Sequence, residues 1–106
     1  MASYSLSDLE KIIQDRAAST AETSYTKSLL EGGPARVAKK FGEEAIEVVI
    51  AAVEPDRNAV VTESADVLYH LLVLLRIRNI SVDEVMGELE RRTRQSGHAE
   101  KASRRS

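Results

Sequence analysis

The chain has 106 residues, contains no cysteine and carries a net charge of −2, with 42% hydrophobic and 4% aromatic residues. This length suits one domain, the missing cysteines exclude a disulfide scaffold, a thiolate zinc site and a cysteine nucleophile, and so few rings exclude a base-stacking surface for single-stranded nucleic acid. The longest apolar run, residues 67–75, contains His70 and is far shorter than the roughly 20 residues of a membrane span, so we expect a cytoplasmic protein whose partners include neither a membrane nor a nucleic acid.

Helix signals follow one another along the first third of the chain. Residues 7–10 read Ser-Asp-Leu-Glu, a capping box with Ser7 as N-cap, and apolar residues at helical spacing extend this helix to about Ala18. A polar stretch follows, and we expect a short second helix over residues 24–31. The Gly-Gly-Pro sequence after it ends this helix and begins the next, since glycine is favoured at helix ends and proline at the first helical position.

The third and fourth helices are predicted to be the longest. The third continues to about Val53 with Gly42 as its only helix-breaking residue, which indicates close packing, the approach of a ligand or simple tolerance. Asp56 suits the N-cap of a fourth helix over residues 57–78. This fourth helix is apolar on nearly every side, so we expect a homodimer in which a second chain covers one of its faces, the alternative being that neighbouring helices enclose it completely.

The end of the chain supplies a last helix and a basic tail. A second capping box, residues 81–84, begins a fifth helix that is expected to end near Ser96. Since no segment alternates like a strand and the connections are short, we predict an all-α fold, an antiparallel bundle of about five helices completed by dimerisation. Residues 1–90 carry a net charge of −7 and residues 91–106 one of +5. We therefore expect a helical domain, 1–96, followed by a basic tail, 97–106.

Acidic residues recur at three-residue spacing on the two long helices. Glu44 and Glu47 share a face of the third helix, and Glu63 and Asp66 share a face of the fourth, because helical residues three apart lie close together. If these faces pack against each other, four carboxylates converge in one cleft and require a cation to offset their repulsion. Oxygen ligands suit a hard ion, Mg²⁺ or Mn²⁺, whereas a di-iron site would need a histidine where Asp66 stands. The alternative is that these acids are ordinary solvated positions.

Four segments together resemble a known enzyme family. They are Ser-Tyr-Thr at 24–26, Lys-Phe-Gly-Glu-Glu-Ala-Ile-Glu at 40–47, Glu-Ser-Ala-Asp-Val-Leu-Tyr-His at 63–70, and 92–101, which contains Ser-Gly and then Glu-Lys. The acidic motifs resemble those of the all-α, MazG-like nucleoside-triphosphate pyrophosphohydrolase superfamily. The first and last segments narrow the resemblance to the phosphoribosyl-ATP pyrophosphohydrolase family, over roughly residues 6–104.

This resemblance implies a hydrolase of histidine biosynthesis. In that reaction, water attacks the α,β-phosphoanhydride of phosphoribosyl-ATP and gives phosphoribosyl-AMP and pyrophosphate. The resemblance also implies Mg²⁺ as cofactor, with Mn²⁺ as an alternative, together with a helical homodimer and a cytoplasmic location. We expect Glu44, Glu47, Glu63 and Asp66 to bind the metal, and Glu44 or Glu47 to serve as the catalytic base as well.

Phosphates also require cationic partners. Arg36 and Lys40 precede Glu44 on the third helix, and Lys40 shares its face, so both are candidates for phosphate binding. Arg94 and Lys101 are candidates in the basic segment, whose tail we expect to close over the ligand. The alternative is a solvated tail without a role in binding.

Two other functions are compatible with the sequence. One is a house-cleaning pyrophosphatase of the same superfamily that acts on nucleoside triphosphates or dUTP. The other is a non-catalytic helical module for dimerisation or metal binding. A nucleic-acid binder that uses the basic tail is disfavoured by the acidic body of the chain, because non-specific affinity for nucleic acid comes mainly from cations that face phosphates.

Overall fold

Five α-helices make up the part of the chain that the computed structural model describes, residues 3–20 and 24–94, and these ranges contain no strand. In chain order the helices are α1 (Leu6–Ala17), α2 (Tyr25–Glu31), α3 (Pro34–Ala52), α4 (Arg57–Ile77) and α5 (Val82–Thr93). The all-α prediction is confirmed, and each predicted helix is present. Within the described residues, no helix is both long and apolar enough to cross a lipid bilayer.

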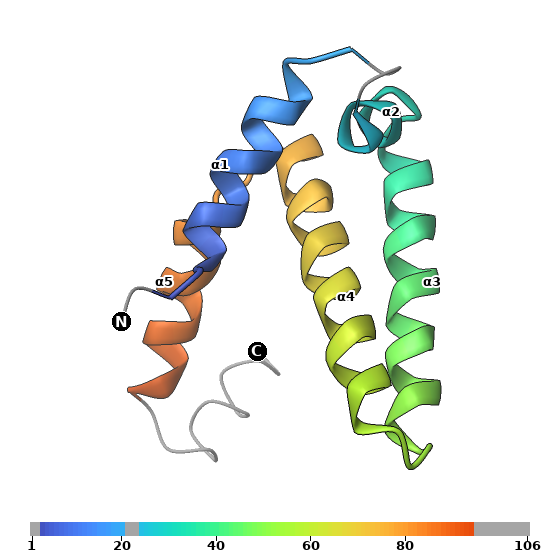
Figure 1. Ribbon diagram of the computed structural model, residues 1–106. Coiled ribbons are helices and arrows are strands. Elements are labelled where there is room, and N and C mark those ends of the chain that lie inside the picture. The colour runs from blue at the N-terminus through green and yellow to red at the C-terminus, as the bar shows by residue number, and fades with distance from the viewer. Residues whose placement is uncertain (1–2, 21–23, 95–106) are drawn as a thin grey trace.

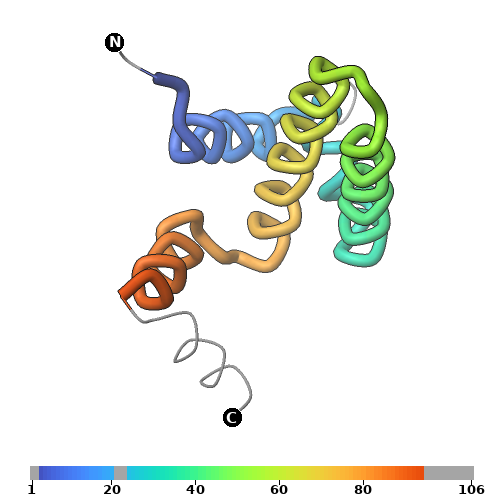
Figure 2. The backbone as a smooth tube through the Cα atoms, turned by 90° about the horizontal axis from the view of Figure 1, so that it is seen from below, coloured from blue at the N-terminus to red at the C-terminus, as the bar shows by residue number. Residues whose placement is uncertain are grey.

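The two long helices form an antiparallel hairpin. α3 and α4 lie side by side along most of their length, and α1 lies on the other side of α4 (Figure 1). The short α2 packs at the start of α3 and also contacts α1 and α4. Figure 2 shows α5 on the same side of α4 as α1, away from α3. The hairpin therefore places the middle of α3 against the first half of α4, where the acidic motifs lie.

The hydrophobic core is concentrated toward one end of this hairpin. Its buried side chains come from all five helices and are Ile13, Leu29, Val37, Leu72, Val73 and Val82. The hairpin contributes Val37 from the start of α3 and two residues from the second half of α4. The rest of the hairpin leaves large apolar side chains between 43% and 82% exposed, namely Ile46, Val49, Ile50, Val53, Val61 and Leu68. We call these six residues the exposed apolar patch, and they show that neighbouring helices of the described chain do not enclose α4 completely.

The start of α1 differs from the prediction. The N-cap is Ser5 rather than Ser7: the Ser5 hydroxyl accepts a hydrogen bond from the Asp8 amide at 3.1 Å, and the Asp8 carboxylate accepts one from the Ser5 amide at 2.9 Å. The sequence contains two overlapping Ser-x-x-acid patterns, and the earlier start adds Leu6, which packs against the core. It also leaves Glu10 free to accept a hydrogen bond from the Val82 amide at 2.8 Å, at the start of α5.

The other helix starts follow the predicted signals. Side-chain oxygens accept hydrogen bonds from backbone amides at the N-caps of α2, α4 and α5, which are Ser24, Asp56 and Ser81. Gly33, directly before Pro34, has a φ of +88°, a left-handed conformation that strongly favours glycine. α5 ends at Thr93, a few residues before its predicted end, and the basic tail lies outside the described residues.

Gly42 lies in open space within the chain. A Cβ atom built on it would have no atom of residues 3–20 or 24–94 within 4 Å beyond its own helix and nearest neighbours. Close packing inside the described chain therefore does not explain this glycine. Gly42 precedes Ile46 of the exposed apolar patch by four residues, so the two lie on the same face of α3.

Candidate active site

Three acidic side chains meet where α3 and α4 face each other. Glu44 of α3 and Glu63 and Asp66 of α4 each offer one carboxylate oxygen, and these oxygens all lie within 4.8 Å of one another. Residues three apart share a helix face, which brings Glu63 and Asp66 together, and the antiparallel packing supplies Glu44 from the other helix. We call these three residues the acid cluster.

Glu47 lies next to the acid cluster but is not one of the three residues that share this spacing. It follows Glu44 by three residues on α3 and is exposed. Its charge still reaches the cluster, because it contributes to raising the pKa of Glu63. The structure thus brings together three of the four predicted acidic residues and leaves the fourth beside them.

The cluster carries uncompensated negative charge. The pKa of the Glu63 carboxyl is raised, first by its withdrawal from water and then by the negative charges of Asp66, Glu47 and Glu44. In the described part of the chain, Glu63 and Asp66 have no ion-pair partner. Glu44 has one, because the Lys40 ammonium lies 3.3 Å from its Oε1, and this hydrogen bond raises the pKa of Lys40.

The donor set of the cluster fits a hard divalent cation. All three side chains offer oxygen, the ligand atom that Mg²⁺ and Mn²⁺ prefer. Two oxygens bound to opposite sides of one Mg²⁺ are about 4.2 Å apart, since each lies about 2.1 Å from the ion. The largest separation in the cluster is within 4.8 Å, so small side-chain movements would bring the three oxygens to one ion.

A basic pocket of about 300 Å³ adjoins the acid cluster along α3. It lies between α2 and α3 and is lined by Tyr25, Leu29, Arg36, Lys39, Lys40 and Glu43. The four residues from α3 follow the spacing of one helix face, which continues to Glu44. Lys40 belongs to the pocket and also contacts Glu44, so the pocket and the cluster are neighbours.

The predicted phosphate-binding residues divide into three groups. Arg36 and Lys40 both line the basic pocket. Arg94 is the C-cap of α5, where its guanidinium lies 3.3 Å from the Glu90 carboxylate, and α5 lies on the opposite side of α4 from α3. Arg94 is therefore not brought to the acid cluster within one chain. Lys101 lies outside the described residues.

A hydrogen-bonded group behind the pocket was not predicted. The Tyr25 hydroxyl lies 3.0 Å from Nε2 of His70, and Nδ1 of His70 lies 2.7 Å from the backbone carbonyl oxygen of Asp66. The Tyr69 hydroxyl bonds to the Thr26 hydroxyl, and the rings of Tyr25 and Tyr69 stack with their centroids 6.3 Å apart. The sequence signals were the Ser-Tyr-Thr segment and the His70 position, which supported the family resemblance without indicating that they meet.

The hydroxyl of Tyr25 lies within the electrostatic reach of both sites. Partial burial is the main reason that its pKa is raised. The positive charge of Lys40 acts in the opposite direction, and the negative charge of Glu44 raises the pKa further. Tyr25, which lines the basic pocket, is therefore also close enough to Glu44 of the acid cluster to be affected by its charge.

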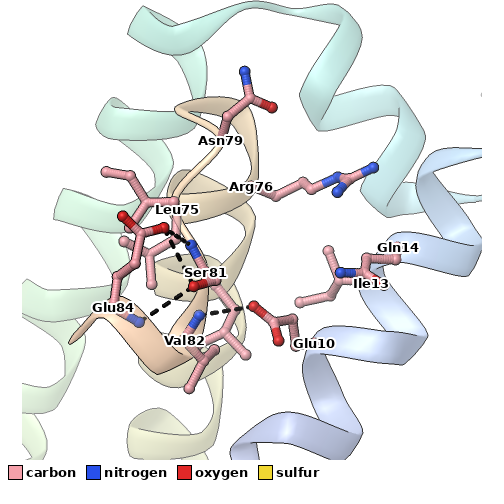
Figure 3. Close-up of a pocket in the computed structure, with 11 residues that line it drawn as sticks. Glu10, Ile13, Gln14, Leu75, Arg76, Asn79, Ser81, Val82 and Glu84 are labelled. Atoms are coloured by element: carbon pink, nitrogen blue, oxygen red, sulfur yellow. Dashed lines mark hydrogen bonds between the residues drawn. The ribbon is translucent and has the colours of Figure 1, made fainter. Parts of the chain in front are cut away.

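A second hollow, of about 180 Å³, lies between α1, the end of α4 and the start of α5 (Figure 3). Several of its polar groups are hydrogen-bonded to one another. Glu10 reaches from α1 to the Val82 amide, and Ser81 and Glu84 form the capping box of α5. The bond from the Val82 amide to Glu10 attaches the start of α5 to α1.

Comparisons with known proteins identify the family of the chain. The chain matches the family model described as phosphoribosyl-ATP pyrophosphohydrolase over residues 6–93. A protein of Methylobacterium nodulans named phosphoribosyl-ATP pyrophosphatase is 57% identical over 105 residues, which cover 99% of this chain and 98% of that protein. Proteins of the same name from Rhizobium johnstonii and Agrobacterium fabrum are 57% and 54% identical and cover 100% and 98% of this chain, and 99% and 97% of their own lengths. The resemblance drawn from the sequence motifs is confirmed, and the chain belongs to the phosphoribosyl-ATP pyrophosphohydrolase family.

Proposed function

We propose that this protein hydrolyses the α,β-phosphoanhydride of phosphoribosyl-ATP to phosphoribosyl-AMP and pyrophosphate, the second step of histidine biosynthesis. The observation that carries the proposal is the acid cluster, in which three carboxylate oxygens lie within 4.8 Å of one another beside a basic pocket. Family membership and the name shared by relatives that match over nearly their full length support the choice of substrate.

The acid cluster is the proposed metal site. Glu44, Glu63 and Asp66 would hold Mg²⁺, or Mn²⁺ as the alternative, with Glu47 as a further ligand from the adjacent turn. A divalent ion there would supply positive charge to the phosphate oxygens and to the leaving pyrophosphate. The positive charge of the ion would also offset the negative charges of Glu63 and Asp66, which have no ion-pair partner in the described part of the chain.

The residues of the chain itself bind the substrate and move the proton. Arg36 and Lys40 are proposed to bind phosphate oxygens, because both line the basic pocket and Lys40 reaches the cluster. The catalytic base is Glu44 or Glu47. We favour Glu47, because Glu44 is already paired with Lys40 whereas Glu47 is exposed beside the cluster. Water attacks phosphorus, the bond to the pyrophosphate oxygen breaks, and the proton of the water passes to the base.

A second copy of the chain is the proposed partner. The exposed apolar patch has no cover within the described chain, and covering it would remove apolar surface from water at roughly 25 cal/mol per Å². Open space around Gly42 on the same face would let a second helix approach closely. Lys101 of the basic tail, 97–106, and Arg94 of α5 are kept as proposed phosphate-binding residues, and Arg94 would have to come from the second copy. We also propose a cytoplasmic location, which suits a nucleotide substrate.

The decisive experiment measures pyrophosphate release by the purified protein from phosphoribosyl-ATP, ATP and dUTP, with Mg²⁺ and with EDTA. We expect release from phosphoribosyl-ATP to be the fastest and to disappear in EDTA. Asp66→Asn should abolish it, whereas Glu54→Gln, which removes an exposed charge from the α3–α4 connection, should retain it. Faster hydrolysis of dUTP or ATP would favour the wider superfamily activity, and no hydrolysis of any substrate would favour a non-catalytic module.

A further inference from the structure

The basic pocket contains hydrogen-bond acceptors as well as cations. Arg36, Lys39 and Lys40 supply positive charge, whereas the Glu43 carboxylate and the Tyr25 hydroxyl oxygen supply acceptors. Oε1 of Glu43 lies 3.9 Å from the Lys40 ammonium, so Glu43 is also an ion-pair partner inside the pocket. Its remaining acceptor capacity is of no use to an ionised phosphate, which carries only acceptors itself. This mixture points to a ligand that has both an anionic group and hydroxyl groups.

The Tyr25 hydroxyl uses its one proton in a hydrogen bond to His70. His70 is only 5% exposed, and its Nδ1 lies 2.7 Å from the Asp66 carbonyl oxygen. A carbonyl oxygen only accepts hydrogen bonds, so Nδ1 must carry a proton and donate it. In the neutral imidazole, Nε2 is then an acceptor, and the Tyr25 hydroxyl donates to it at 3.0 Å.

This arrangement restricts what Tyr25 can bind. Its oxygen retains acceptor capacity but has no second proton to donate. An ionised phosphate oxygen cannot donate a hydrogen bond to it, whereas the hydroxyl of a sugar can. Tyr25 therefore selects for a hydroxyl group at the same pocket in which Arg36 and Lys39 select for an anion.

The size and place of the pocket fit one part of a larger substrate. Its volume of about 300 Å³ is at the lower end for ligand pockets, which suits a sugar phosphate. Arg36 and Glu44 are eight residues apart on α3, which corresponds to about 12 Å along the helix axis. A ligand whose anhydride lies at the acid cluster would thus reach the pocket with a group at its other end.

We propose that the basic pocket is the subsite for the ribose phosphate group that phosphoribosyl-ATP carries and ATP lacks. Arg36 and Lys39 bind the phosphate, and the Tyr25 oxygen accepts a hydrogen bond from a ribose hydroxyl, which makes Tyr25 a specificity-determining residue. The identity of this ligand rests on the proposed function. Gly32, the C-cap of α2, lies beside Arg36, and a Cβ at this position would require the arginine side chain to move.

The first test measures binding without turnover. Ribose 5-phosphate and inorganic phosphate are titrated into the full chain in EDTA, and dissociation constants are obtained from NMR chemical shifts. The wild type should prefer ribose 5-phosphate, and Tyr25→Phe should lose about 2- to 10-fold of that preference, the effect of one neutral hydrogen bond, while binding inorganic phosphate unchanged. Arg36→Gln should weaken both ligands. The matched control is Tyr4→Phe, since Tyr4 is 66% exposed and lines neither hollow.

The second test asks which anionic group of the substrate binds in the basic pocket, the ribose phosphate or the triphosphate. Tyr25→Phe and Arg36→Gln should raise KM for phosphoribosyl-ATP and leave the inhibition constant of ATP unchanged. Arg36 is exposed, so its variant remains informative if Tyr25→Phe, which leaves the buried His70 nitrogen without its donor, fails to fold. If both constants rise together, the pocket serves the triphosphate and the proposal is overturned.

The binding test also distinguishes this proposal from the proposed function. A wild type that binds ribose 5-phosphate no better than inorganic phosphate, or a Tyr25→Phe variant that keeps the preference, would overturn the subsite whatever the enzyme hydrolyses. Preferential binding by a protein that releases no pyrophosphate would instead contradict the proposed reaction and leave the subsite standing.

Discussion

Without metal, the Asp66→Asn variant should be more stable than the wild type. With Mg²⁺ present, it should be less stable than the wild type. Carboxylate oxygens of Asp66 and Glu44 lie within 4.8 Å of each other. Like charges at this distance repel by about 1 kcal/mol in water and by about 3.5 kcal/mol at an effective dielectric of 20. The Glu44 side chain is 14% exposed, so the repulsion lies between these two values. For a domain of this size, about 1 kcal/mol corresponds to a rise in Tm of roughly 4–8 °C.

Mg²⁺ should make the wild type more stable than the Asp66→Asn variant. A ligand stabilises the folded protein by about 2.7 kcal/mol at 100 times its Kd and by about 4.1 kcal/mol at 1,000 times its Kd. Saturating Mg²⁺ should therefore outweigh the gain from removing the repulsion between Asp66 and its neighbours. The wild type should receive this stabilisation in full, whereas Asp66→Asn replaces one of the three carboxylates by a neutral amide, which binds the ion more weakly. Thermal melts of both proteins at one fixed protein concentration, in EDTA and in saturating Mg²⁺, measure the reversal.

Glu54→Gln is the control for the loss of a negative charge outside the acid cluster, and its response to Mg²⁺ should equal that of the wild type. A lower Tm of Asp66→Asn in EDTA would refute the repulsion in the cluster. An equal rise in the Tm of wild type and Asp66→Asn with Mg²⁺ would refute the metal site.

Three further substitutions test the core, one ion-pair network and the proposed dimer. Leu72→Ala removes a core side chain that is 4% exposed and should lower the free energy of unfolding by about 2–5 kcal/mol in urea titrations, and a smaller loss would show that this end of the hairpin is loosely packed. Hydrogen bonds from Arg91 and Arg92 lower the pKa of Glu88 to about 2, so its stabilising contribution is complete above the ordinary value of 4.5 and is lost as the pH falls toward 2. Glu88→Gln should therefore be less stable than wild type at neutral pH, with a deficit that narrows in melts at decreasing pH, and a constant deficit would contradict this assignment. Ile46→Glu places a charge in the exposed apolar patch and should convert a dimer to a monomer in light scattering, whereas an unchanged mass would place the interface elsewhere.

Local signals in the sequence account for the helices because their causes lie within a few residues. N-cap oxygens bond to amides two or three residues ahead, so Ser24, Asp56 and Ser81 marked helix starts without knowledge of the fold. The same signal was ambiguous at α1, where two patterns overlap. There the choice of Ser5 over Ser7 is associated with Leu6 packing on the core and with the bond from Val82 to Glu10, which are contacts between distant parts of the chain.

In the candidate site, too, some features follow from local sequence patterns and others only from the packing of distant segments. Three-residue spacing predicted that Glu63 and Asp66 share a face, but only the rotation of the packed helices decides that Glu44 joins them while Glu47 lies beside them. The bond from Tyr25 to His70 spans 45 positions of the chain, and no local pattern could have paired these two residues. The position of α5 beside α1, which separates Arg94 from the acid cluster within one chain, is also a tertiary result.

The sequence by itself determined the all-α class, most helix boundaries and the family, because capping, helical spacing and motif letters are properties of short segments. The tertiary structure decided which carboxylates share a site, which cations and ring residues adjoin it, and which apolar side chains are left uncovered. These features depend on the rotation and offset of one helix against another, which arise from the packing of side chains that lie far apart along the chain.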